Sequence, residues 1–456
     1  MIGCVQAAST GAWAWPYEIP AKWIGHTGFF HSGIRPAVNM ILSTVSYVPG
    51  KGVLVAGTAI LRIDDEGKPH VMLGTLRPAP GVYETPSEVT YTPRVGLLIA
   101  YDHSGFAPVE DEEGRIVRYR FLSYKHILRQ YQDRWSLVDP PKVPDVSGDD
   151  WTIEAMMPAR DGGVYVFGTN RGPMVANIPH LPRPRLEGAR WLSRAFHYDG
   201  EQWRDLTPSG LGLVEFRSEC RLSDHEIAVV GRVVKAREDG FLDRFDPWAA
   251  IYDELSGRWQ VLPPPRPPLH PLLRWRFSHA ACDRTKRRVW VSADCVVHEA
   301  RSNWIFRFSQ EFAKLYSYDG ESGWRVYDLP ERPEEEIEEP DDAFRAITAL
   351  AVSPDGTPWI GLQTELERTA PVLRLVEGEW RVYPLPKVSG VSAYHPWSMG
   401  FDPRGEGWAT AFVFGGAATG SAGPLLLRMR GDHWEQQNWT WSWWRQRGFG
   451  LFGPLR

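Results

Sequence analysis

A short hairpin pattern that returns seven times along the chain is the feature that most limits its possible folds. In the clearest copy, an apolar run at 347–352 leads into the turn Ser353-Pro354-Asp355-Gly356, and a second apolar run follows at 358–362. Such a turn between two short apolar runs is typical of two antiparallel strands joined directly. Equivalent turns are expected near Pro49, Pro93, Pro158, Ser223, Arg284, Pro354 and Pro403.

A second marker, a tryptophan that opens a further strand, follows the hairpins in the same order. In the clearest copy, the apolar run at 372–375 is followed by a glycine turn and then by Trp380. Two independent markers in one phase predict a repeated unit of four strands, and we expect the tryptophans to pack against the neighbouring unit. The marker recurs at Trp135, Trp203, Trp259, Trp324, Trp380 and Trp434, and only the first unit lacks it.

Seven four-stranded units bury both faces of every sheet when they stand radially around an axis. The sequence therefore predicts an all-β fold, a seven-bladed β-propeller of four-stranded antiparallel blades. The N-terminal segment 1–38 is expected to be either a strand that closes the ring beside the last blade or a cap outside it. The expected blades cover 39–80, 81–144, 145–210, 211–268, 269–336, 337–388 and 389–456.

Composition agrees with many short strands and excludes several classes of function. Glycine and proline are abundant, at 43 and 38 residues, and few segments keep a helical apolar period. The 51 basic residues are outnumbered by 56 acidic ones, which argues against a protein that binds nucleic acid through a basic surplus. No run approaches the roughly 18 apolar residues of a membrane span. We expect neither a nucleic-acid partner nor a membrane span.

The cysteines and the N-terminus give little indication of a special environment. Cys4, Cys220, Cys282 and Cys295 are scattered, so neither a zinc site nor a disulfide framework is expected. The first residues lack a basic segment followed by an apolar one, which favours a cytoplasmic location. The Ile2-Gly3-Cys4 stretch leaves a secreted or lipid-anchored form open.

One unit resembles the repeat of two known propeller families. The segment 351–361, which reads Ala-Val-Ser-Pro-Asp-Gly-Thr-Pro-Trp-Ile-Gly, is similar to repeats of two-component-regulator propellers and streptogramin B lyases, as is the ending at 383–386. The resemblance implies a propeller. In the lyases, histidines and Mg²⁺ cleave a cyclic depsipeptide, and the nearest candidates here are His279 and His395. The lyases' Trp-Phe-Thr-Glu strand is missing, so no catalytic role is carried over.

The lengths of the expected connections differ between the two ends of the ring. In up-and-down blades, the first and third turns lie at one end, while the second connection and the link to the next blade lie at the other. Nearly all extra length falls in the second group, at 102–118, 170–191, 233–248, 295–312, 140–150, 263–271 and 330–343. Loops on a rigid scaffold carry binding residues, so we expect the loop-rich end to be the binding face.

Residues on these loops, or just before inner strands at the channel mouth, are the candidate binding residues. Arginine and tryptophan suit a protein hot spot or a ring-shaped polar ligand. The candidates are Trp151, Arg171, Arg276, His298, Arg301, Trp304, His395 and Trp397.

No nucleophile elbow, phosphate loop or metal-binding helix motif occurs, so we expect no catalytic residue, no metal ligand and no cofactor. The sequence favours a binding or scaffold propeller that recognises a protein partner. Two alternatives stay open: a metal-assisted enzyme similar to the lyases, using His279, His298 or His395, and a glycan-binding lectin that uses exposed tryptophans. A small molecule or glycan therefore remains a possible ligand.

Overall fold

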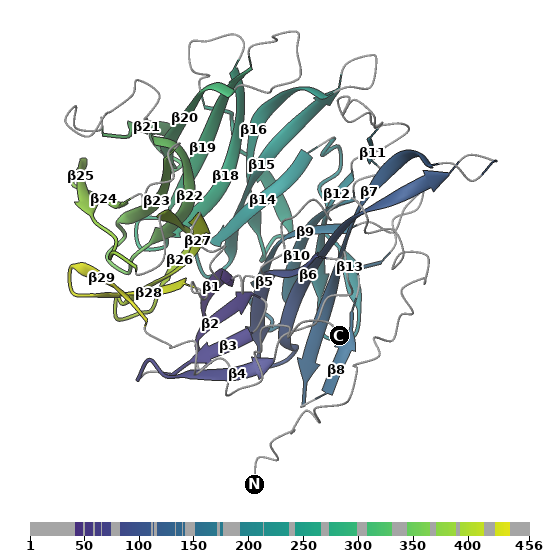
Figure 1. Cartoon of the computed structure of the whole chain (residues 1–456), viewed down its shortest axis with the longest axis horizontal. Helices are drawn as coiled ribbons and strands as arrows, with labels where there is room; N and C mark the ends of the chain where they lie inside the picture. The colour runs from purple at the N-terminus through teal and green to yellow at the C-terminus, as the bar shows by residue number, and fades with distance from the viewer. Residues whose placement is uncertain are drawn as a thin grey trace.

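The computed structural model describes residues between Leu42 and Gln437, with gaps of which the largest are 74–82, 142–150, 177–191, 266–272, 299–307, 331–343 and 415–424. The described residues form strands and no helix, and none of them forms a helix that could cross a membrane. The strands build seven antiparallel sheets arranged as a propeller (Figure 1), which confirms the predicted fold.

Each sheet is one blade, numbered here in chain order. Blade 1 contains β1 (Leu42–Val48), β2 (Gly52–Gly57), β3 (Ile60–Ile63) and β4 (Pro69–Leu73), and blade 2 contains β5 (Tyr83–Thr92), β6 (Gly96–Glu110), β7 (Ile116–Tyr131) and β8 (Arg134–Leu137). Blade 3 contains β9 (Trp151–Pro158), β10 (Val164–Asn170), β12 (Leu192–Tyr198) and β13 (Trp203–Asp205), and blade 4 contains β14 (Val214–Arg221), β15 (Glu226–Ala236), β16 (Leu242–Asp253) and β17 (Arg258–Val261).

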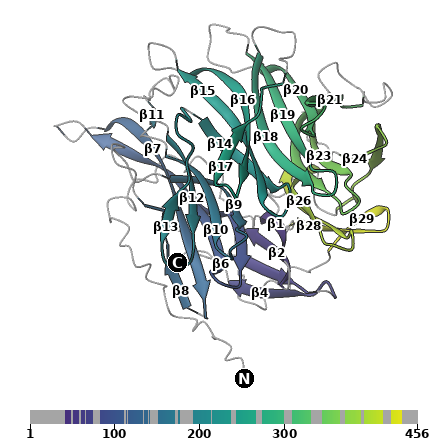
Figure 2. The same ribbon diagram turned by 180° about the vertical axis from the view of Figure 1, so that it is seen from behind.

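Blade 5 contains β18 (Leu273–Asp283), β19 (Arg288–His298), β20 (Phe308–Tyr318) and β21 (Trp324–Asp328), and blade 6 contains β22 (Phe344–Val352), β23 (Pro358–Thr364), β24 (Val372–Val376) and β25 (Glu379–Tyr383). Blade 7 contains β26 (Ala393–Phe401), β27 (Gly407–Phe414), β28 (Leu425–Arg430) and β29 (His433–Gln436). The first strand of every blade lies nearest the middle of the ring (Figures 1 and 2).

The hydrophobic core is divided among the contacts between neighbouring blades. Between blades 4 and 5, for example, Val230 packs in one cluster with Phe277 and Val291. Between blades 6 and 7, Trp359 shares a cluster with Leu427. Each sheet therefore has apolar residues on both faces, which explains the nearly continuous apolar runs of its middle strands.

Three of the repeated tryptophans fasten their outer strands to the preceding blade. The indole N–H of Trp259 donates to the backbone oxygen of Leu206 at 2.8 Å, and that of Trp324 donates to Pro263 at 2.6 Å. Trp380 donates to the backbone oxygen of Asp328 in the same way. At these three positions the prediction that the tryptophans pack against the neighbouring blade is confirmed.

The ring closes where blade 1 packs on blade 7. Strand β1 lies against β26, and the backbone N–H of Val45 donates to the hydroxyl of Ser398 at 3.2 Å. All four strands of blade 7 come from 393–436, while segment 1–38 lies outside the described residues. Among the described strands, contact between complete blades closes the ring.

The expectation about the cysteines is wrong for one pair. Cys220 on β14 and Cys282 on β18 form a disulfide between neighbouring inner strands, with their Cα atoms 5.5 Å apart. Their separation of 62 residues is about one blade, so the pair becomes adjacent only when the ring is built. Disulfides are typical of oxidising compartments, and the cytoplasmic location stays a prediction.

Candidate functional site

The two ends of the ring differ in the connections between strands. At one end the turns are short, such as the four residues between β14 and β15 and the four between β18 and β19. The connections at the other end are longer, but several of the expected loops are strands. Strands β6 and β7 stay paired from Leu97 opposite Gln130 as far as Glu110 opposite Ile116. The expected loop at 102–118 is therefore mostly a two-stranded ribbon.

Two further blades extend in the same way, and blade 3 contributes to the ribbon of blade 2. Strands β15 and β16 pair as far as Ala236, and β19 and β20 as far as His298. Strand β11 (Met174–Ala176), from the expected insertion of blade 3, pairs with β7 next to Phe121 (Figure 2). These segments are ordered by backbone pairing rather than being simple loops.

The predicted binding residues fall into three groups. The structure places Trp151 in β9, Arg276 in β18 and His298 at the end of β19, and their side chains lie outside the described part. Three others, Arg171, Arg301 and Trp304, lie outside the described residues altogether. His395 and Trp397 are fully described and lie within β26.

A β-bulge interrupts the inner strand of every blade near the same height. Between Pro396 and Ser398, for example, the register with β27 skips Trp397. An extra residue on an edge strand bends the strand and redirects a side chain. The bulged residues are Ser43, Ser87, Glu154, Arg217, Ser278, Thr348 and Trp397. They form a ring of one residue per blade, which we call the bulge ring.

Charged side chains concentrate where blades 3 and 4 meet in the bulge ring. A guanidinium nitrogen of Arg217 lies 2.6 Å from Glu215 and another lies 3.7 Å from Glu154 of blade 3. Glu215 is fully buried and also pairs with Arg232 at 2.6 Å. Burial alone would lower the pKa of Arg217, but the charges of Glu215, Glu154 and Asp294 raise it above its ordinary value. Arg217 therefore stays charged while its side chain remains partly exposed.

The remaining described members of the bulge ring carry hydroxyl groups and one aromatic ring. The hydroxyl of Ser278 donates to Asp294, and that of Thr348 donates to the backbone oxygen of Pro396 at 2.5 Å. Trp397 is 48% exposed, the highest value among the large apolar residues of the described inner strands. The neighbouring His395 is buried, and burial lowers its pKa to about 4, so this imidazole is neutral at physiological pH.

Glu219 is a carboxylic acid at a position where the other blades are apolar. It lies two residues beyond the bulged Arg217 on β14. The equivalent residues of the other six blades are all buried and apolar, namely Val45, Val89, Met156, Ala280, Leu350 and Met399. Burial raises the pKa of Glu219 to about 7. Sequence reasoning missed this residue, although aligning the seven inner strands would have found it.

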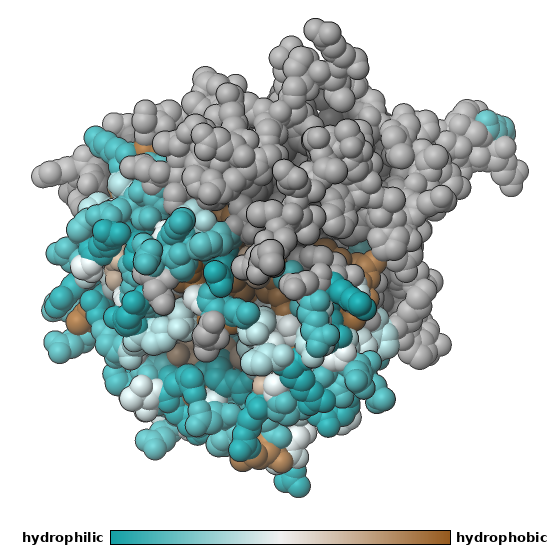
Figure 3. Space-filling view, turned by 90° about the horizontal axis from the view of Figure 1, so that it is seen from below, coloured by the Kyte–Doolittle hydropathy of each residue, from teal (hydrophilic) through white to brown (hydrophobic). Residues whose placement is uncertain are grey.

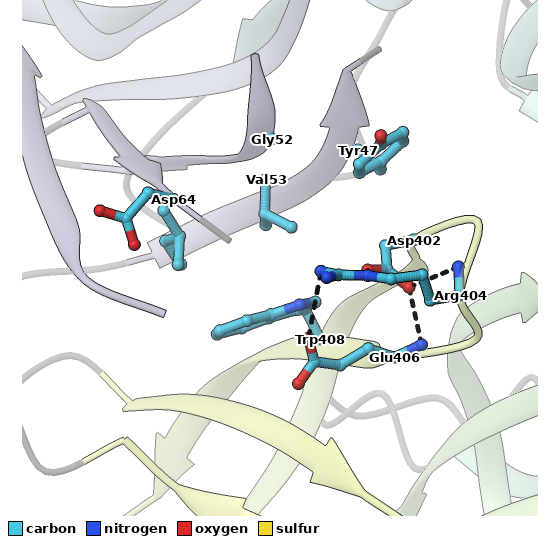
Figure 4. Close-up of a pocket in the computed structure, with 9 residues that line it drawn as sticks. Tyr47, Gly52, Val53, Asp64, Asp402, Arg404, Glu406 and Trp408 are labelled. Atoms are coloured by element: carbon cyan, nitrogen blue, oxygen red, sulfur yellow. Dashed lines mark hydrogen bonds and ion pairs between the residues drawn. The ribbon is translucent and has the colours of Figure 1, made fainter. Parts of the chain in front are cut away.

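A small pocket lies at the seam between blades 1 and 7 (Figure 4). The aspartates that line this pocket already have hydrogen-bond and ion-pair partners. Asp402 accepts hydrogen bonds from the backbone N–H groups of Arg404 and Glu406, and Arg404 pairs with its carboxylate at 2.8 Å. Across the pocket, hydrogen bonds from His70 and from the backbone of Lys68 hold the pKa of Asp64 below its ordinary value.

This seam pocket has room for little more than a water molecule, far less than a typical ligand site. Its ion pairs fix two turns where the ring closes, so we assign it a structural role. Figure 3 shows the molecule from below, where the described surface is mainly hydrophilic and apolar residues gather mostly in its middle.

The described residues contain no group of three or more His, Cys, Asp or Glu side chains placed to hold a metal ion. His279, a candidate of the lyase-like alternative, lies 3.0 Å from the hydroxyl of Ser292 through Nδ1. Within the described part, His279 is hydrogen-bonded and His395 is buried.

No protein-family model matches the sequence, and no curated protein matches it. Solved structures match over most of the chain at low identity. A protein of unknown function from Dyadobacter fermentans has a TM-score of 0.42 at 10% identity, covering 82% of this chain and 94% of the other. YCF48 from Cyanidioschyzon merolae has a TM-score of 0.41 at 12% identity, covering 86% and 96%. A PL25 ulvan lyase bound to a saccharide has a TM-score of 0.42 at 12% identity, covering 78% and 84%.

Proposed function

We propose that this protein is a non-catalytic binding propeller that recognises a protein partner through the end carrying the long connections. The observation that carries the proposal is the difference between the two ends. Strands of blades 2, 4 and 5 continue there as paired ribbons, whereas the turns at the other end are short. Ordered projections on a rigid ring offer a partner a large surface at small entropic cost.

At the short-turn end, several charged side chains form ion pairs with each other. This supports the opposite end as the binding face. Arg287 pairs with Glu226 of blade 4, and Arg284 pairs with Asp224 of the same blade. Arg221 pairs with Glu254 at 2.6 Å. The pairs of Arg284 and Arg287 link turns of blades 4 and 5, whereas the pair of Arg221 lies within blade 4, so these basic residues serve the ring itself.

The test shortens the β15–β16 ribbon and leaves the rest of blade 4 unchanged. In β15 and β16, Val234 lies opposite Phe245, so residues 235–244 can be replaced by Asn-Gly, which closes a two-residue hairpin. The matched control is Leu255→Ser, which changes an exposed apolar residue in a short turn at the opposite end.

Both variants and the unchanged protein are used to capture partners from a native extract, and the captured proteins are quantified by mass spectrometry. We expect the shortened ribbon to lose a partner that Leu255→Ser retains. Equal recovery by all three proteins, or loss only with Leu255→Ser, would contradict the proposed face.

A further inference from the structure

The bulge ring contains an aromatic ring and polar side chains, which are the groups that bind sugars, and Trp397 is the most exposed of its described side chains. The indole is 48% exposed, whereas its chain neighbours His395 and Met399 are 2% and 7% exposed. Other described tryptophans, such as Trp359 and Trp408, are buried at 2%. An exposed indole among buried neighbours presents a flat apolar face, which is the surface on which the C–H face of a sugar ring packs.

The structure holds the backbone around Trp397 in place from both sides. Thr348 of blade 6 donates to the backbone oxygen of Pro396, and Ser398 accepts the N–H of Val45 from blade 1. The bulge at Trp397 is therefore tied to both neighbouring blades. A preorganised aromatic platform loses little entropy when a ligand binds.

Groups that hydrogen-bond hydroxyls lie in the same ring. Arg217 is fixed by Glu215 and Glu154, yet its side chain stays 27% exposed. The carboxylate of Glu154 and the guanidinium of Arg217 are an acceptor and a pair of parallel donors for neighbouring hydroxyls. Ser278 adds a hydroxyl that is held by Asp294. Because all these residues occupy equivalent bulges, they encircle the axis near one height.

We propose that the bulge ring binds a carbohydrate, with one sugar ring stacked on Trp397 and its hydroxyls directed toward Arg217, Glu154 and Ser278. Two features of the ring support a sugar over a metal ion. The described residues offer no three-ligand metal group, and the carboxylates of Glu154 and Glu215 are paired with arginine. The site is separate from the proposed protein-binding ribbons.

The full chain is titrated with a set of neutral and uronic-acid monosaccharides and oligosaccharides, by isothermal calorimetry and by tryptophan fluorescence. We expect at least one sugar to bind with a Kd below 10 mM. Trp397→Ala should weaken that binding at least tenfold, and Trp397→Phe should restore most of it. Tyr131→Ala is the matched control, because it removes another exposed aromatic ring, at the end of β7 in blade 2.

Arg217→Lys should also weaken sugar binding by roughly tenfold, because a lysine lacks the planar pair of donors. Its circular dichroism spectrum and Tm are measured alongside, since it loses ion pairs. Absence of binding by every sugar in the set would overturn the proposal. Unchanged affinity of Trp397→Ala, or a loss with Tyr131→Ala as large as with Trp397→Ala, would also overturn it. The variant with the shortened β15–β16 ribbon should bind the sugar normally, so failure of the proposed protein-binding face is measured separately.

Discussion

Glu219 provides a direct test of how an acidic side chain on an inner strand affects stability. Its pKa of about 7 in the folded protein compares with 4.5 for a free glutamate, because burial disfavours its charged form. Between these two pH values, the folded chain holds a proton that the unfolded chain has released. The free energy of unfolding should therefore fall as pH rises from about 4.5 to about 7 and stay lower above that.

The size of this loss follows from the difference between the two pKa values. Each unit corresponds to about 1.4 kcal/mol, so the complete loss at pH 8 is roughly 3 kcal/mol. Methionine occupies the equivalent position in blades 3 and 7, at Met156 and Met399. Glu219→Met should consequently stabilise the protein by up to about 3 kcal/mol at pH 8 and by little at pH 4.5.

The assay is differential scanning calorimetry of the unchanged protein and Glu219→Met at pH 4.5 and pH 8. Subtracting the two proteins at each pH removes the contribution of all other titrating groups. Glu321→Gln is the control, because it neutralises an exposed glutamate in a turn of blade 5 and should behave alike at both pH values. The same stability difference at both pH values would refute the reasoning, since it would mean that the Glu219 carboxylate is solvated.

Three further predictions concern contacts between and within blades. Replacing Cys220 by Ser removes the link to Cys282 and should cost about 2–4 kcal/mol, seen as a lower denaturation midpoint that reducing agent no longer changes. Arg232→Met leaves the carboxylate of Glu215 buried with one partner fewer and should cost about 3–5 kcal/mol in urea unfolding, whereas equal stability would show that the pair is solvated. Trp324→Phe keeps an aromatic ring but loses the indole donor, so we expect about 1 kcal/mol of destabilisation by the same assay.

The propeller could be predicted because local signals repeat. Turns such as Ser353-Pro354-Asp355-Gly356 require particular residues, and Gly356 adopts a φ of 81° that favours glycine. The hydroxyl of Ser353 forms hydrogen bonds with Asp355 and Thr357 that complete the turn. A turn of this kind can be recognised from its own few residues. Repetition then fixes the number of blades without any knowledge of distant contacts.

The ribbons and the disulfide could not be predicted because they depend on pairing between distant or weakly patterned segments. The stretch from Asp102 to Glu110 includes Gly105 and Pro108, which argue against a long strand, yet it pairs with β7 along its whole length. Cys220 and Cys282 lie a full blade apart and become adjacent only through the ring. Neither the extended β6–β7 pairing nor the disulfide can be inferred from the local sequence.

The candidate site in the bulge ring could not be predicted from the sequence. The variation among its residues is also what a binding site needs. Its members share a position but not a single residue type: three are serine, and the other four are Glu154, Arg217, Thr348 and Trp397. A bulged residue is left out of the ladder on an edge strand, so packing restricts its identity less than it restricts the residues on either side. The neighbouring position two residues on is apolar in six blades and acidic only at Glu219. The same backbone bulge is thus repeated in all seven blades, while its side chains differ most in blades 3, 4, 6 and 7, and this combination gives a symmetric ring an asymmetric set of chemical groups, as the proposed sugar site requires.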